Sequence, residues 1–146
     1  MSSSIYSYTF KPGARPVDIR EEFTRGDKHS FSFLAYENDG ETPFNLGVFD
    51  SFKCQLRIGS ALNKNILAEL DAGDFILGQS QEALDYEVAE SLPAGSIFDE
   101  LHCHFQSALL VDVKVKKLLL DVQGIEGLDV TTFGSGSIKL NFDVTR

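Results

Sequence analysis

The sequence predicts an all-β protein that folds as a sandwich of two sheets. Apolar and polar residues alternate in several short stretches, of which residues 31–36, 52–58 and 138–144 are the clearest. This period of two is typical of strands with one face in a core and the other in water. Phenylalanine supplies much of the apolar face, with 12 residues in the chain. Glycine, asparagine and aspartate separate the stretches, and these residues favour turns.

Length and composition favour one domain. A chain of 146 residues is long enough to bury roughly two-thirds of the surface that it exposes when unfolded. No apolar run approaches the ~20 residues of a membrane span, and Met1-Ser2-Ser3-Ser4 lacks the basic and apolar segments of a signal peptide. We therefore expect a protein that is made and folded in a cytoplasm and has no membrane partner.

The charge balance argues against nucleic acid as a partner. Acidic residues outnumber basic ones by 22 to 13, which gives a net charge of −9. A surface of this sign repels phosphate backbones. The one short basic cluster is Lys114, Lys116 and Lys117, and the solvated face of a strand explains it.

Residues 1–17 are expected to form an extended N-terminal arm on a single sandwich domain of residues 18–146. The apolar residues of the arm precede Lys11-Pro12-Gly13-Ala14-Arg15-Pro16, where two prolines and a glycine exclude a helix. The segment is either a frayed terminus or an arm that docks on a neighbouring subunit. The side chains that would make these partner contacts are Ile5, Tyr6, Tyr8 and Phe10.

The elements of the first half follow from the alternating pattern and the turn residues. Residues 17–24 form a strand or a short turn, and residues 25–28 form a tight turn. The next expected elements are a strand at 30–37, a hairpin-like turn at 38–41, a short apolar piece at 44–46, a strand at 51–58, a loop at 60–65 and a strand at 66–70.

The second half predicts further strands, to a total of about eight to ten with little helix. Residues 110–122 are ambiguous, because their apolar positions change phase at Lys116-Lys117. A β-branched run disfavours a helix there and indicates a bulge or a tight turn within strands. The other expected elements are a turn at 71–74, a strand at 75–77, a further strand at 83–88, a short helical turn at 90–95, an alternating strand at 97–105 and a closing strand at 137–144.

Both cysteines are expected in the core as free thiols. Cys54 and Cys103 each have apolar neighbours two positions away on both sides, so each faces inward on a strand. In an immunoglobulin-type sandwich two such cysteines could bridge the sheets. Without a secretion signal or a nearby tryptophan, buried free thiols are favoured.

One histidine pair raises the question of a metal site. On a strand, His102 and His104 project from the same face, together with Glu100. Two histidines and a carboxylate could begin a zinc site. No fourth ligand is indicated, and His29 lies in a distant turn, so we expect a solvent-facing or interface pair and no metal.

The remaining polar motifs are interpreted as structural. Asp71, Asp74 and Asp85 lack the patterned spacing and glycine hinge of a calcium loop. Arg25-Gly26-Asp27 spells an adhesion tripeptide, but glycine and aspartate also form turns. No nucleophile elbow, phosphate loop or paired-cysteine motif is present. We expect neither an enzyme nor a bound cofactor.

Several phrases occur in an order that resembles a known family. They are Arg25-Gly26-Asp27-Lys28-His29-Ser30-Phe31-Ser32-Phe33, Asp39-Gly40-Glu41-Thr42-Pro43-Phe44-Asn45-Leu46, Phe52-Lys53-Cys54-Gln55-Leu56-Arg57, Leu92-Pro93-Ala94-Gly95-Ser96-Ile97-Phe98-Asp99-Glu100-Leu101 and Val144-Thr145-Arg146. Over residues 25–146 this order is similar to that of the N-terminal domain of many phage baseplate and tail proteins, the baseplate-upper-protein type. Lys28-His29 stands where the family usually has a Thr-Phe pair.

The resemblance implies a structural component of a tailed-bacteriophage virion, most simply a baseplate or tail protein. Its fold would be an immunoglobulin-like antiparallel β-sandwich, and its partners would be other virion proteins and copies of itself. It would be assembled in the host cytoplasm and located in the virion. A capsid decoration (cement) protein or a neck protein is the alternative within this class. A carbohydrate-binding module for host attachment would instead need exposed aromatics, for which the candidates are Tyr36, Phe49, Phe98 and Phe133.

Overall fold

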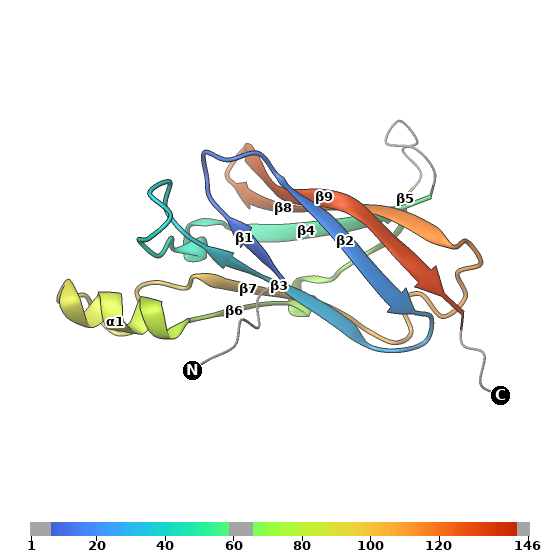
Figure 1. The fold of residues 1–146 in the computed structure, drawn as a ribbon, viewed down its shortest axis with the longest axis horizontal. Coiled ribbons are helices and arrows are strands. Elements are labelled where there is room, and N and C mark those ends of the chain that lie inside the picture. The colour runs from blue at the N-terminus through green and yellow to red at the C-terminus, as the bar shows by residue number, and fades with distance from the viewer. Residues whose placement is uncertain (1–6, 59–65, 143–146) are drawn as a thin grey trace.

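The computed structural model describes residues 7–58 and 66–142 and confirms the all-β sandwich. Over these residues nine strands form two sheets that pack face to face (Figure 1). The first sheet has the order β1 (Tyr8–Phe10), β3 (His29–Ala35), β7 (Glu100–Phe105) and β6 (Phe75–Gly78). The second has the order β2 (Val17–Thr24), β9 (Asp129–Asn141), β8 (Lys117–Glu126), β4 (Ser51–Arg57) and β5 (Ile66–Glu69). The helical elements are α1 (Gln81–Ala89) and the 3₁₀ turns η1 (Leu46–Val48) and η2 (Ala72–Asp74).

Phenylalanine rings from both sheets fill the space between them. Phe133 on β9 is 1 % exposed, and its ring centroid lies 4.4 Å from that of Phe10 and 5.9 Å from that of Phe33. The rings of Phe49 and Phe52 also pack against Phe133, with centroids 5.2 and 6.0 Å from that of Phe133. Such tilted and edge-on pairs each add about 0.5–1.5 kcal/mol beyond the burial of their area. The alternating phenylalanines are therefore used for packing, as the pattern predicts.

Two strand pairs are parallel, which corrects the expectation of a fully antiparallel sandwich. β1 runs parallel to β3, and β2 runs parallel to β9. The chain reverses between β1 and β2 and reverses again between β2 and β3, so β1 and β3 point the same way. The remaining sheet pairs are antiparallel. The immunoglobulin-like connectivity stays a prediction.

The expectation of a free arm over residues 1–17 is wrong for Tyr8 and Phe10. Both belong to β1, and Phe10 is 4 % exposed in the core of its own chain. The Tyr8 hydroxyl donates to the Glu21 carboxylate at 2.5 Å and accepts from the Arg20 N–H at 3.1 Å, which ties β1 to β2. The proline-rich segment that follows turns the chain back instead of extending it. The other two arm residues, Ile5 and Tyr6, lie outside the described residues.

A helix replaces the strand that was expected at residues 83–88. α1 begins after Ser80, whose Oγ accepts from the Ala83 N–H at 3.1 Å and so caps the helix. Glutamine, glutamate, alanine and leucine in its first turn are good helix formers. The short helical turn expected at 90–95 is also wrong, because α1 ends at Ala89 and Ser91 follows with a φ of 56°.

The ambiguous stretch at 110–122 divides into turns and a strand. Residues 107–112 form turns, and β8 begins at Lys117, where the apolar pattern changes phase. A tight turn with Gly127 at a φ of 62° joins β8 to β9, so the closing strand begins at Asp129 and not at residue 137. None of the helices in the described part of the chain is long and apolar enough to cross a lipid bilayer.

Candidate interaction surfaces

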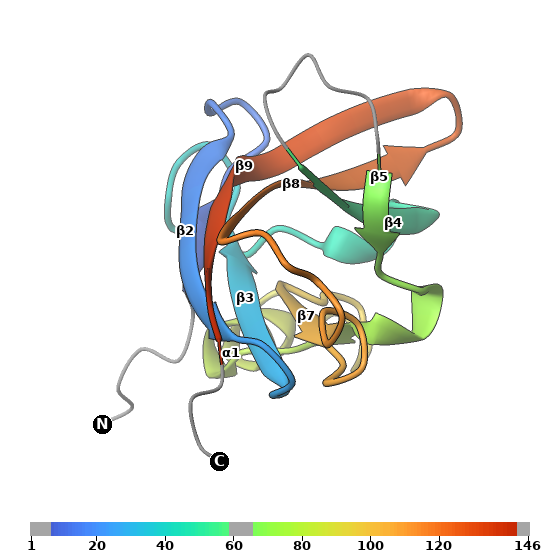
Figure 2. The same ribbon diagram turned by 90° about the vertical axis from the view of Figure 1, so that its right-hand side faces the viewer.

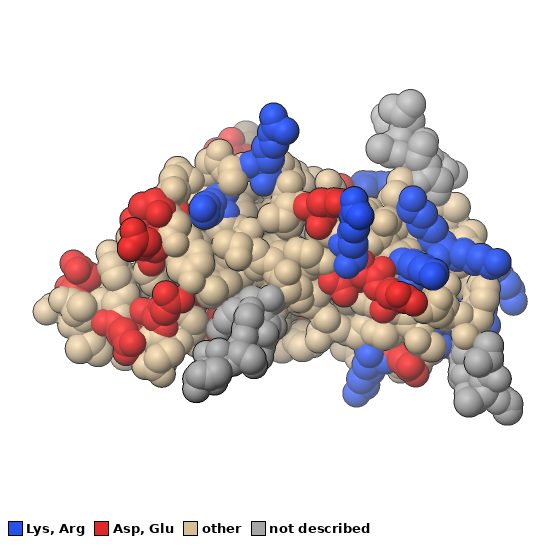
Figure 3. All heavy atoms as spheres, viewed as in Figure 1, with Lys and Arg blue, Asp and Glu red and all other residues tan. Residues whose placement is uncertain are grey.

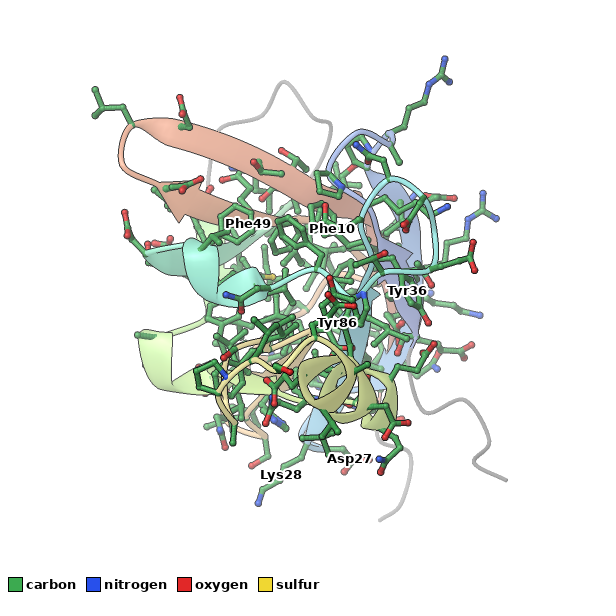
Figure 4. The ribbon with its side chains drawn as sticks, turned by 90° about the vertical axis from the view of Figure 1, so that its left-hand side faces the viewer. Phe10, Asp27, Lys28, Tyr36, Phe49 and Tyr86 are labelled. Atoms are coloured by element: carbon green, nitrogen blue, oxygen red, sulfur yellow. The ribbon has the colours of Figure 1, made fainter. Side chains whose placement is uncertain are left out.

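α1 exposes apolar side chains at one end of the sandwich (Figures 1 and 4). Leu84 is 40 % exposed and Val88 is 81 % exposed. Because they are four residues apart, both project from the same side of the helix, and Asp85 lies beside them. We call Leu84, Asp85 and Val88 the helix surface. The adjacent side of α1 is buried through Ala83 and Glu87.

A buried carboxylate holds α1 to the loop that follows it. Glu87 accepts hydrogen bonds from the Ile97 N–H at 2.8 Å, the Gly95 N–H at 3.3 Å and the Gln79 side-chain amide at 2.7 Å. The Gln79 amide also donates to the Ile97 carbonyl at 2.8 Å. The bond from the Ile97 N–H is the main cause that holds the pKa of Glu87 below its ordinary value. The carboxylate therefore closes residues 87–97 into one unit.

A second buried carboxylate fixes the start of α1. Asp99 is fully buried, and its two oxygens accept from the Ser80 N–H at 2.8 Å and the Ser80 hydroxyl at 2.5 Å. Burial raises the pKa of Asp99, and the bonds from Ser80 act in the opposite direction. With Glu87 holding the C-terminal part, α1 is anchored at both ends.

Tyr36 connects the loop between β3 and β4 to the helix. Its hydroxyl donates to the Glu82 carboxylate at 2.7 Å, and burial, followed by this bond, raises the pKa of Tyr36 to about 12. Figure 4 looks onto this end of the molecule, with α1, which carries Tyr86, in front and Tyr36 near it. The helix surface therefore belongs to a helix that hydrogen bonds of Glu87, Asp99 and Tyr36 hold in place.

A groove lies at the opposite end of the sandwich, which faces the viewer in Figure 2. It has a volume of about 400 Å³ and collects side chains from the end of β4, from β5 and from the loop between β7 and β8. Arg25 supports this loop, because its guanidinium donates to the Val113 carbonyl at 3.0 Å and lies 4.5 Å from the centroid of the Phe142 ring. We call this feature the apolar groove; its main lining residues are Ile58, Leu67, Leu109, Val113, Lys114 and Val115.

Charge is divided between the two ends. Residues 65–113 contain no lysine or arginine, and this segment includes α1 with its acidic Glu82, Asp85 and Glu90. Three of the next four residues are lysines. Lys114 lines the apolar groove, and Lys116 and Lys117 follow it in the chain. Figure 3 shows acidic side chains gathered over the α1 end, whereas basic side chains, with several acidic ones among them, lie toward the other end.

The expected histidine pair forms, with Glu100 on the same strand. His102 Nε2 lies 3.0 Å from the Glu100 carboxylate, and the rings of His102 and His104 are 6.5 Å apart. His29 instead uses its Nε2 on the Thr24 backbone and stacks on Phe23 at 4.2 Å. Within residues 7–58 and 66–142, no group of three or more histidines, cysteines or carboxylates is placed to hold a metal.

The other predicted residues lie where the turns and strands put them. Cys54 and Cys103 are free and buried, as predicted, and burial raises the pKa of both thiols. The Arg25-Gly26-Asp27 motif is the turn from β2 to β3, with Gly26 at a φ of 91°. Asp71 and Asp74 cap η2, where the Asp74 carboxylate accepts from the Asp71 N–H at 2.9 Å.

The four aromatic candidates for a glycan platform do not lie together on one exposed face. Phe133 is in the core, and half-buried Phe49 packs against it. Tyr36 and Phe98 are also half-buried. None of the four rings is largely exposed, so they do not form an exposed aromatic cluster. The carbohydrate-binding alternative stays a prediction.

No family model matches this chain, and no curated protein is similar enough to it to count as a relative. The surfaces must therefore be judged from their own geometry. Sequence reasoning missed both of them. The signal for α1 was present in Ser80 followed by Gln81-Glu82-Ala83-Leu84, whereas the apolar groove joins segments that are far apart in the chain.

Proposed function

We propose that this chain is a structural component of a tailed-bacteriophage virion, a baseplate or tail protein that acts through protein–protein contacts. The observation that carries the proposal is the helix surface. Val88 is 81 % exposed, yet the helix that presents it is held by two buried carboxylates. An exposed apolar side chain on a rigid frame is typical of a docking site.

The phrases that resemble the baseplate family also support the proposal by their position. The first falls on the turn into β3, the second on the loop after β3, and the third on β4. The phrase that begins at Leu92 connects α1 to β7. They therefore fall on successive turns and strands of one sandwich, in the order that a shared domain would require. A role as a capsid decoration or neck protein rests on the same contacts and differs in location.

The location of the chain in the particle tests the proposal. Antibodies raised against the purified chain are applied to purified tailed-phage particles that carry its gene, and the gold label is located by electron microscopy. Label on the tail or baseplate is the expected result, with mass spectrometry of the same particles as an independent check. Label confined to the capsid or neck would replace the baseplate role by the alternative one. Absence of the chain from the particles would refute the proposal.

A matched pair of variants links the location to the helix surface. Val88→Asp places a charge at the proposed contact, and Val130→Asp places the same charge on β9, where Val130 is 57 % exposed. We expect Val88→Asp to reduce incorporation of the chain into particles and Val130→Asp to leave it unchanged. Equal incorporation of both variants would show that α1 is not the contact.

A further inference from the structure

We propose that copies of this chain associate head to tail, with the helix surface of one copy seated in the apolar groove of the next. The inference deepens the proposed function, on which it rests for its biological setting, by naming one partner and both contact surfaces. It concerns the purified chain alone, so it is tested separately from the location in a virion.

The helix surface has the form of an inserting element. Leu84 and Val88 lie on one side of α1, next to the side that is buried through Ala83 and Glu87, and both are exposed. Asp85 lies next to them, and Glu82 and Glu90 are exposed on the same helix and its cap. A helix that offers two apolar side chains four residues apart fits the groove-binding mode of peptide recognition.

The apolar groove has the complementary form and charge. Its volume is about 400 Å³, and its lining includes Leu67, which is 39 % exposed, and Val115. Lys114 lines the groove, and Lys116 and Lys117 follow it on the exposed chain. Within the described residues none of these three lysines forms an ion pair, so their charge is available to an acidic partner. Asp112 is the one carboxylate in the lining.

The charges decide between the possible arrangements of two copies. A contact of helix surface with helix surface would bring Asp85 of one copy against Asp85 of the other, with Glu82 and Glu90 nearby on each helix and its cap. A contact of groove with groove would oppose the lysines. Only the head-to-tail arrangement brings acids to lysines, and like-charge juxtaposition is strongly unfavourable at interfaces. Because the two surfaces lie at opposite ends (Figures 1 and 3), each copy can use both, and the assembly grows into a ring or an open filament.

Sedimentation velocity over a concentration series tests the association of the purified chain. The wild type is expected to form species larger than a dimer, and added salt is expected to weaken them because exposed charges are screened. Val88→Asp and Leu67→Asp should each raise the dissociation constant at least about tenfold. Val130→Asp is the matched control, because it puts the same charge on an exposed valine outside both surfaces, and it should associate like the wild type.

A mixture of the two defective variants provides the decisive measurement. Val88→Asp retains an intact groove and Leu67→Asp retains an intact helix surface, so together they should form a one-to-one dimer that grows no further. Neither variant alone should do so. Circular dichroism and thermal unfolding establish that each variant is folded. Should Leu67→Asp fail to fold, the variant Lys114→Glu replaces it, because Lys114 is exposed and its change reverses the charge of the groove while the helix surface stays intact.

Three results would overturn the inference. The first is a wild-type chain that stays monomeric at every concentration reached. The second is an association that Val88→Asp does not weaken. The third is a mixture of the defective variants that stays monomeric although each is folded. None of these results bears on whether the chain is found in a virion, so the proposed function would stand or fall on its own test.

Discussion

Gly136 is a single residue that allows two neighbouring strands to lie close together. It lies on β9 opposite Ile19 of β2, and a β-carbon at this position would be 1.9 Å from the Ile19 carbonyl oxygen. No side chain can yield there, because the obstacle is backbone. Gly136→Ala is therefore expected to separate β2 from β9 and to lower the free energy of unfolding by about 1–3 kcal/mol or more.

Urea unfolding measures this loss, and Gly73→Ala is its control. A β-carbon at Gly73 meets no atom within 4 Å, so that variant should stay within about 0.5 kcal/mol of the wild type. If both variants unfolded at the same urea concentration, the close approach at Gly136 would not govern the pairing of β2 with β9.

The two thiols are a second case in which one residue reports on the surrounding core. Cys54 and Cys103 are fully buried, and burial raises the pKa of each thiol, which leaves little thiolate to react. In the native protein a thiol reagent should modify them at roughly a thousandth or less of the rate seen in the unfolded chain. The measurement is the release of a coloured thiolate in buffer and in denaturant. Rapid modification in buffer would mean that the space between the sheets is open.

At the scale of elements, strands could be predicted from the sequence better than the helix or the N-terminal segment. The strands expected at 51–58 and 66–70 are confirmed within one residue, because their alternation is a local signal. The helix at 81–89 is short, and the spacing of its apolar residues fits the period of a helix as well as that of a strand. What selects it is the set of bonds from Ser80 and Glu87 to residues 10 to 19 positions away. Such contacts depend on the tertiary structure and leave little trace in a local pattern.

Asp99 tests how far one buried carboxylate supports α1. Asp99→Ala leaves the buried Ser80 N–H without its acceptor, which should lower the free energy of unfolding by about 1–3 kcal/mol. Limited proteolysis should then cut faster within residues 79–95. Asp99→Asn keeps one oxygen for that N–H and removes a buried charge, so its loss should be smaller. Equal losses for the two variants would show that the acceptor at position 99 is not what holds the helix.

At the scale of the whole molecule, the sandwich brings distant segments together and separates opposite charges. The apolar groove combines Leu67 with Val113 and Val115, and the lysines next to it were interpreted from the sequence as an ordinary solvated face. Their position at the end opposite α1 follows from the direction of each strand in the two sheets. The class of fold was therefore predictable from period and turns, whereas the surfaces required the strand order.

The pH dependence of stability should reflect buried and hydrogen-bonded carboxylates that act in opposite directions. The pKa of Glu87 is lowered in the folded chain by the Ile97 N–H, and that of Asp39 is lowered to about 2 by its bonds from Thr42. A lowered pKa contributes stability above the ordinary pKa, and this contribution is lost as pH falls through the folded value. Asp99 has a raised pKa in the folded chain, so the folded chain takes up this proton at a higher pH than the unfolded chain does. Acidification between the two pKa values therefore adds stability.

Urea unfolding from about pH 7 to about pH 3, across the ordinary carboxyl range, should show Glu87→Gln with lower stability at neutral pH and a shallower decline in acid. Asp99→Asn should lose the gain on mild acidification. A Glu87→Gln variant whose stability falls with pH as steeply as that of the wild type would contradict the role of Glu87.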